Sequence, residues 1–178
     1  MWRRRGTAML VALLLAFSGP RAWSAERSDE NEVKAAVAYN LLLFIQWPAQ
    51  ISSASSFRLC VIDDGALTTA LRPYAGRVVQ GHSLEIQRIS ATPEELDACV
   101  AVMVEAGYPG VLERLGVLAR SRALLVIGEG TGALDRGAMI GLRADGGRIT
   151  FDIDLGAMRR GGLVPSSKIL RLARTLIE

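Results

Sequence analysis

The chain has 178 residues, of which 50% are hydrophobic and 22% are charged, and its formal net charge at pH 7 is +3. This length suits a single domain, and the apolar fraction predicts a packed core rather than disorder. Four arginines (Arg3, Arg4, Arg5 and Arg21) precede Glu26, the first acidic residue, so the rest of the chain is close to neutral and lacks the positive charge typical of a nucleic-acid binder.

The first 25 residues have the layout of a secretory signal peptide. Three arginines precede an apolar run over residues 7–17, and small residues surround Ala25, where we expect cleavage. A membrane anchor needs roughly 20 apolar residues, and the polar residues 18–21 end this run too early. The sequence therefore predicts a signal peptide over residues 1–25 and one exported domain over residues 26–178.

A helix is predicted over residues 32–46, ended by Trp47 and Pro48. Its apolar surface is wider than one helical stripe, because Leu42, Leu43 and Ile45 lie outside the main row of apolar positions. Two interpretations are equally open: the helix lies in a deep groove of its own domain, or it also contacts a second chain. The candidate partner or dimer residues are Tyr39, Leu42, Leu43, Phe44 and Trp47.

After a serine-rich link over residues 52–56, the middle of the chain alternates strands and helices. We expect strands over 57–62, 77–89 (interrupted near Gly81), 100–104 and 123–127, and helices over 66–74, 92–99 and 110–120. Thr92, followed by Pro93, is a strong helix start, with a capping hydroxyl before proline at the first helical position. The last two strands and the helix between them form a βαβ unit, which implies parallel strands.

Two cysteines, Cys60 and Cys99, are expected to form a disulfide, because an exported chain meets an oxidising compartment. Closing a loop of about 40 residues removes denatured-state entropy worth roughly 4 kcal/mol. The alternative is two unpaired cysteines, since Cys60 lies inside an apolar run and cysteine is often buried without a partner.

The end of the chain predicts antiparallel structure. Strands over 138–143 and 148–153 are joined by a tight hairpin, a short turn or helix follows over 155–160, and a last helix opens at Pro165 and extends to Leu176. The predicted fold class is therefore α/β: a single domain with a mixed, mostly parallel sheet of about six strands, flanked by helices, with a C-terminal β-hairpin and helix.

No set of catalytic residues emerges from the motifs. Residues 128–133 fit the pattern G-x-G-x-x-A, but a strand rather than a helix follows, so a dinucleotide site is not expected. Asp63 and Asp64 resemble the acidic pair of receiver domains, but the third aspartate is replaced by Glu105. His82 is the only histidine, which disfavours triads and zinc sites. We expect no enzyme, no cofactor and no metal.

A second candidate site lies between the last short helix and the end of the chain. Two donors, Arg160 and Lys168, flank the stiff residue Pro165, and together with Ser166 and Ser167 they form a candidate rim for a ligand or partner. The simpler interpretation is a helix N-terminus with Ser166 or Ser167 as its cap. A small-molecule-binding sensor domain is therefore the alternative function.

Five segments, taken together, resemble one family. They are residues 33–48, the strand 57–61, the hairpin segments 137–142 and 147–155, and the ending 157–173. In order and spacing they are similar to the YfiR family of periplasmic regulators, and the similarity covers nearly the whole chain after the signal peptide.

The resemblance implies a non-enzymatic periplasmic regulator. Such proteins repress a membrane-bound, YfiN-like diguanylate cyclase by binding its periplasmic sensor domain, which controls cyclic di-GMP and biofilm formation. An OmpA-like, YfiB-like lipoprotein sequesters the repressor, and the family is described as homodimeric. The family member YfiR has two cysteine pairs whereas this chain has two cysteines, so any redox response here depends on Cys60 and Cys99.

Overall fold

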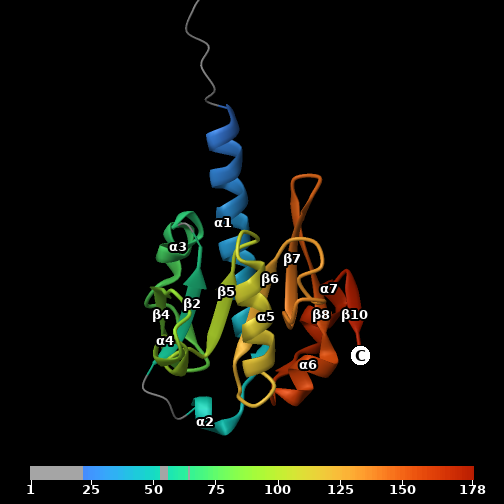
Figure 1. Cartoon of the computed structure of the whole chain (residues 1–178). Helices are drawn as coiled ribbons and strands as arrows, with labels where there is room; N and C mark the ends of the chain where they lie inside the picture. Colours follow the sequence, from blue (N-terminus) through green and yellow to red (C-terminus); the bar gives the residue numbers. More distant parts are fainter. Residues whose placement is uncertain (1–21, 53–55, 64) are drawn as a thin grey trace, which may run out of the picture.

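The computed structural model describes residues 22–52, 56–63 and 65–178 (Figure 1). Residues 1–21 of the predicted signal peptide, residues 53–55 of the serine-rich link and Asp64 lie outside the described residues. Residues 22–25, at the expected cleavage site, form the first turn of helix α1 (Ala22–Leu43).

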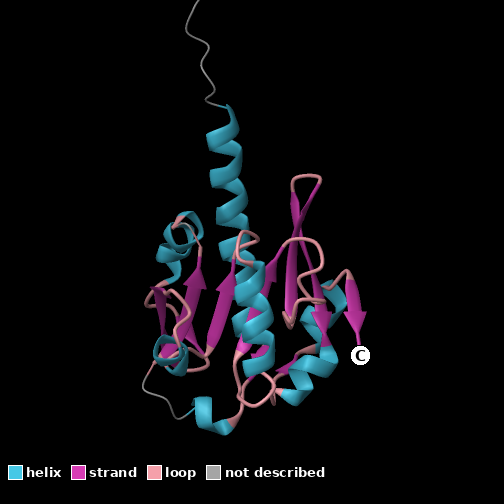
Figure 2. Ribbon diagram, in the orientation of Figure 1, coloured by secondary structure: helices cyan, strands magenta, loops and turns pink. Residues whose placement is uncertain are grey.

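A twisted sheet of eight strands forms the centre of the described chain (Figure 2). The strand order is β10-β8-β7-β6-β5-β2-β4-β3, and only the pairs β7–β8 and β3–β4 are antiparallel. The strands are β2 (Phe57–Ile62), β3 (Val78–Val79), β4 (His82–Arg88), β5 (Ala101–Val104), β6 (Leu125–Glu129), β7 (Ile140–Asp145), β8 (Arg148–Asp154) and β10 (Thr175–Ile177). The predicted single α/β domain with a mixed, mostly parallel sheet is confirmed, with eight strands rather than about six.

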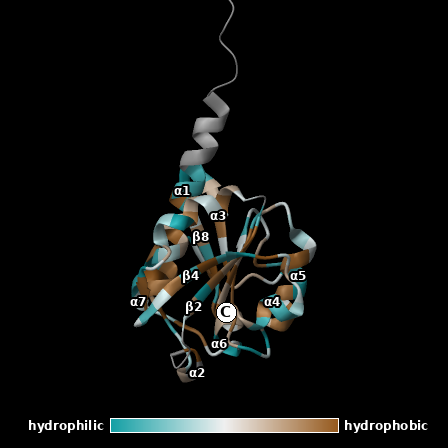
Figure 3. Cartoon of the chain, turned by 90° about the vertical axis from the view of Figure 1, so that its left-hand side faces the viewer, coloured by the Kyte–Doolittle hydropathy of each residue, from teal (hydrophilic) through white to brown (hydrophobic). Residues whose placement is uncertain are grey.

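Helices cover both faces of the sheet. Figure 3 shows α1, α3 (Ala66–Leu71) and α7 (Ser167–Leu172) on one side, and α4 (Pro93–Asp97) and α5 (Pro109–Leu118) on the other. Three short helices lie at turns: α2 (Ala49–Ser52), η1 (Arg72–Tyr74) and α6 (Leu155–Arg160). Every residue of β5 and β6 is buried, as expected for central strands covered on both faces.

The first helix ends earlier than predicted. The expected helix over 32–46 stops at Leu43, and Ile45–Gln46 form strand β1, which pairs antiparallel with β9 (Val164–Pro165). The apolar pattern predicts one continuous helix, but its last apolar residue, Ile45, belongs to this strand and is buried there. Pairing with a distant segment therefore overrides the local helical pattern.

The last helix is also shorter than predicted. It ends at Leu172, and Leu176 lies in β10, which pairs in parallel with β8. The Arg174 N–H donates to the Phe151 carbonyl at 2.8 Å, and the Arg174 guanidinium pairs with Asp152 at 2.5 Å. These contacts to β8 hold the ending as an edge strand instead of a helical turn.

Local signals elsewhere are confirmed. Thr92 caps α4 in a capping box, in which its hydroxyl accepts from the Glu95 N–H and the Glu95 carboxylate accepts from the Thr92 N–H at 3.0 Å. Gly146 and Gly147, with φ of 55° and 77°, form the tight turn between β7 and β8. The β5-α5-β6 unit is parallel, as the pattern predicts.

Helix α5 approaches the loop between β6 and β7 at two glycines. A Cβ atom added to Gly116 would lie 2.6 Å from the Gly137 Cα and 2.9 Å from the Gly137 carbonyl oxygen. Gly137 has φ of 102°, a conformation that favours glycine. The backbone of α5 thus packs directly on the loop, with no space for a side chain between them.

Candidate functional site

The two predicted candidate groups are brought together by β1 and β9. Ile45 pairs with Pro165, and the Ser166 N–H donates to the Phe44 carbonyl at 2.9 Å. The Lys168 ammonium lies 4.2 Å from the centre of the Phe44 ring, a cation–π contact. Residues at the end of α1 and at the start of α7 therefore form one continuous surface.

We call this the β1–β9 surface and define it by Phe44, Trp47, Val164, Pro165 and Lys168. Phe44, Trp47 and Pro165 are half-buried, and Val164 is 52% exposed. Val164 is the exposed large hydrophobic side chain of this surface, and Phe44, Trp47 and Pro165 add partly exposed apolar area to it. An apolar surface with one cation is the character of a protein-binding region rather than of a catalytic centre.

The other predicted helix residues have structural contacts. Leu42 is fully buried in the core and exposes no surface to a partner in this structure. Tyr39 stacks against Tyr74 with ring centroids 4.9 Å apart. Leu43 is half-buried against the core. Most of the surplus apolar surface is thus buried within the domain, because α1 contacts both the sheet and α3.

Trp47 is held by two contacts. Its ring meets the Phe57 ring edge-on at 4.9 Å, and its indole N–H donates to the Leu42 carbonyl at 3.4 Å. On the opposite side, the Gln80 amide donates to the carbonyls of Leu43 and Ile45 at 3.3 and 3.2 Å. Gln80 has φ of 51° in the β3–β4 turn, a feature that no sequence signal identified. The junction of α1 and β1 is therefore held by the start of β2 and by the β3–β4 turn.

The residues of the predicted ligand or partner rim do not all lie together in the fold. Pro165 and Lys168 are part of the β1–β9 surface and the Ser166 backbone bonds to Phe44 beside them, whereas Arg160 lines a separate pocket beside α5. Ser166 occupies the N-cap position of α7, but its side chain makes no capping bond, and its buried hydroxyl has no partner among the described residues. Ser167 is the exposed first residue of α7.

The predicted disulfide between Cys60 and Cys99 is present, with the two Cα atoms 5.9 Å apart. Cys60 lies at the centre of β2 and is fully buried, whereas Cys99 follows α4 and is partly exposed. The bond ties the helical layer of α4 to the middle of the sheet.

A buried ion pair connects α1 to the carboxyl end of β6. The Lys34 ammonium lies 3.1 Å from Glu129 Oε2 and 2.7 Å from Glu30, and the Glu129 Oε1 atom is buried without a hydrogen-bond partner among the described residues. Burial raises the pKa of the Glu129 carboxyl above its ordinary value of 4.5, against the lowering effect of Lys34. Burial lowers the pKa of Lys34, but Glu30 and Glu129 outweigh it, so this pKa lies above 10.5.

The Glu129 carboxyl makes the stability of the protein depend on pH. In the window between 4.5 and the raised pKa of the folded state, the folded protein holds a proton that the unfolded chain has released, so stability falls as pH rises through that window. We expect the stability of wild type relative to Glu129→Gln to fall by up to about 1.4 kcal/mol per pH unit there. Urea unfolding between pH 4.5 and 7.5 measures this.

The exposed residue Glu32 offers a control on the same side of the fold. In the variant Glu32→Gln, the free energy of unfolding should depend on pH in the same way as in wild type. A wild-type profile parallel to that of Glu129→Gln across the whole range contradicts the prediction.

The glycine-rich motif and the acidic pair have the following local structure in the described part of the chain. A series of turns, not a helix, follows the glycines of residues 128–132. Asp63 is engaged by the Thr68 backbone N–H at 2.7 Å and by Arg88 at 3.2 Å. Within the described ranges, no cluster of three or more histidine, cysteine or acidic side chains is arranged to hold a metal ion, and no helix has the length and apolar character to cross a membrane.

Comparison with known proteins identifies one family and one fold. A family model described as YfiR/HmsC-like matches residues 31–174. A conserved domain protein from Vibrio cholerae O1 biovar El Tor strain N16961, known from its crystal structure, has a similar fold, with a TM-score of 0.55 and 16% sequence identity. The alignment covers 82% of this chain and 60% of the Vibrio protein. The comparison with curated proteins gave no match.

Proposed function

The chain belongs to the YfiR/HmsC-like family, and on this basis we propose that it represses a membrane-bound diguanylate cyclase by binding the periplasmic sensor domain of that enzyme. The family match over residues 31–174 carries the proposal, since it extends from α1 to α7. Proteins of this family are periplasmic regulatory domains and are not known as enzymes. A repressor of this kind acts by binding one state of its target more tightly, and a preference of about 3 kcal/mol changes activity roughly a hundredfold.

The proposal has three further parts, each supported by the family resemblance. The protein reaches the periplasm through the signal peptide of residues 1–25 and works there as a homodimer. A YfiB-like lipoprotein releases the cyclase by sequestering the repressor. The result is control of cyclic di-GMP and of biofilm formation.

The proposal is tested by deleting the gene and measuring cellular cyclic di-GMP. Deletion should raise cyclic di-GMP, and expression of the wild-type chain with its signal peptide should restore the lower level. Expression of residues 26–178 alone, which lack the leader, should not restore it. Unchanged cyclic di-GMP on deletion, at normal cyclase abundance, contradicts the proposed repression.

The β1–β9 surface is the proposed contact with the cyclase, because it combines exposed apolar area with the Lys168 cation. Val164→Asp should weaken binding to the isolated sensor domain at least tenfold, since burying an exposed valine contributes about 1.5 to 3 kcal/mol and the new charge must be desolvated. Titration calorimetry with the purified domains measures this. The folded state should be unaffected, because Val164 is 52% exposed.

Val78→Asp is the matched control. Val78 is 63% exposed on β3, an edge strand of the central sheet, and is not part of the β1–β9 surface, so the same substitution there should leave affinity within about twofold. Equal loss of binding in the two variants would place the contact elsewhere.

A further inference from the structure

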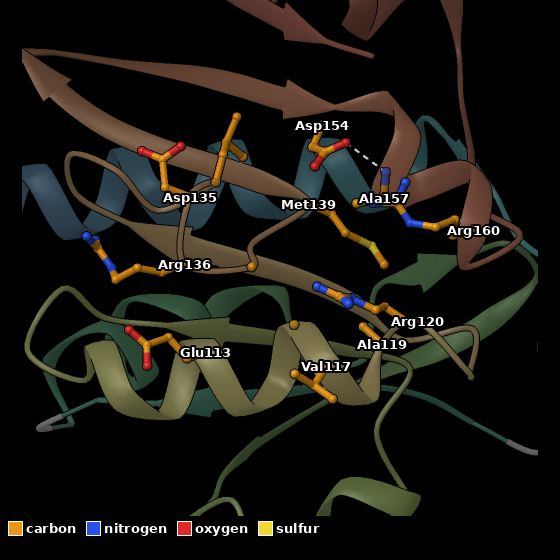
Figure 4. A pocket seen from close by; sticks show the side chains of 13 residues that line it. Glu113, Val117, Ala119, Arg120, Asp135, Arg136, Met139, Asp154, Ala157 and Arg160 are labelled. Carbon is orange, nitrogen blue, oxygen red and sulfur yellow. Dashed lines mark hydrogen bonds between the residues drawn. The ribbon is translucent and has the colours of Figure 1, made fainter.

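A pocket of about 240 Å³ lies between α5, the β6–β7 loop and α6 (Figure 4). This volume exceeds the cavity of about 150 Å³ that holds benzene in an engineered protein, so it admits a molecule of about ten non-hydrogen atoms. The base of the pocket is rigid, since Ala119 and Met139 are almost fully buried and the close contact between Gly116 and Gly137 also lines it.

Two arginines enter this pocket from different helices. Arg120 follows α5 and Arg160 ends α6, and Figure 4 shows their side chains extending from opposite walls with Met139 between them. Neither guanidinium forms an ion pair or a hydrogen bond with any described residue. By contrast, each of four other arginines pairs with a carboxylate: Arg58, Arg88, Arg122 and Arg174.

The charges that line the pocket are unevenly placed. Glu113, Asp135 and Arg136 lie at the far end in Figure 4, away from Arg120 and Arg160. Of the carboxylates that line it, only Asp154 lies at the arginine end, and its Oδ1 atom accepts the Ala157 N–H at 2.7 Å. Among the side chains that line the pocket, the arginine end therefore has two guanidinium groups and one carboxylate, beside apolar residues. This combination suits a ligand with one anionic group and a small apolar body.

We propose that this pocket binds a small organic anion, whose carboxylate or phosphate lies between Arg120 and Arg160 and whose apolar part contacts the accessible apolar side chains that line the pocket, Ala157 among them. The inference is independent of the proposed repression, because it concerns a different surface from Phe44 and Val164 and its test reads binding alone. It gives the protein a second input, a small molecule, beside its protein partner.

The test is titration calorimetry of the full domain with four probes at physiological salt. Benzoate and phenyl phosphate supply the two head groups, benzamide is the neutral isostere of benzoate, and inorganic phosphate lacks the apolar part. At least one organic anion should bind tenfold or more tightly than benzamide, and phenyl phosphate should exceed inorganic phosphate. Failure of both organic anions, or equal binding of benzamide, overturns the proposal. Equal binding of inorganic and phenyl phosphate overturns the organic class.

Variants locate the site. Arg120→Gln and Arg160→Gln should each weaken binding of the anion about tenfold or more, because each removes a charge-assisted hydrogen bond. Arg114→Gln on α5 and Arg159→Gln on α6 are matched controls: both residues are exposed and neither lines the pocket. Ala157→Leu, which fills the pocket without changing charge, should abolish binding. Equal weakening in the control variants assigns binding to general surface charge and overturns the site.

Discussion

Replacing both cysteines with alanine should lower the free energy of unfolding by about 4 kcal/mol, a large part of the stability of a domain this size. Cys60 and Cys99 are 39 positions apart, so the bond closes a long loop in the unfolded chain. Alanine is the appropriate replacement, because Cys60 is fully buried and serine would place a hydroxyl there without a partner. Equilibrium unfolding in urea measures the difference.

The reduced wild-type protein is the control for the double variant. A reducing agent should lower the stability of wild type by a similar amount and leave the variant unchanged. Cys99 is the partly exposed sulfur, so attack by an external thiol is expected there rather than at Cys60. If the protein represses a cyclase as proposed, reduction should also weaken repression. A variant within about 1 kcal/mol of wild type contradicts the role assigned to the bond.

Gly116→Ala should destabilise the protein by about 2 to 3 kcal/mol, although alanine is the better helix former. The added methyl group would lie 2.6 Å from the Gly137 Cα, so α5 must move away from the β6–β7 loop. Backbone atoms cannot rotate aside as a flexible side chain can. Thermal and urea unfolding measure the loss.

Gly110 provides the opposite case on the same helix. A Cβ at Gly110 meets no atom within 4 Å, so Gly110→Ala should be neutral or stabilise by up to about 1 kcal/mol through helix propensity. The same substitution thus changes sign between two positions of α5. Destabilisation of equal size in both variants contradicts the packing explanation for Gly116.

The elements that could be predicted from sequence depend on local chemistry. Thr92 and Pro93 mark the start of α4, and Gly146 with Gly147 marks the β7–β8 turn. The apolar runs of β5 and β6 signal strands covered on both faces. The disulfide could be predicted because the chain has two cysteines and an expected export signal. The residues around each cysteine gave no indication of the bond.

The predictions that were wrong concern elements whose ends depend on pairing with distant segments. Ile45 continues the apolar pattern of α1, and only its pairing with Pro165 makes it a strand residue. Leu176 continues the apolar pattern of α7, and only its pairing with the edge of β8 makes it a residue of strand β10. For the same reason, sequence reasoning named Phe44 and Lys168 separately but had no means to place them in contact. Likewise, no local signal in the sequence shows that Arg120 and Arg160 lie on opposite sides of one pocket.

The antiparallel pairing of β1 with β9 sets an order of assembly for a chain that emerges with its N-terminus first. Strand β1 appears early, but its partner follows every strand of the central sheet except β10. Until then the C-terminal segment does not cover Phe44, Ile45 and Trp47. A chaperone that binds unfolded chains would therefore bind at this apolar stretch. The parallel core can form before this joint closes, because its strands are contiguous in sequence from β2 to β7. Completion of the β1–β9 surface therefore requires the chain as far as Lys168, so a copy truncated before Val164 would lack the surface proposed for the cyclase.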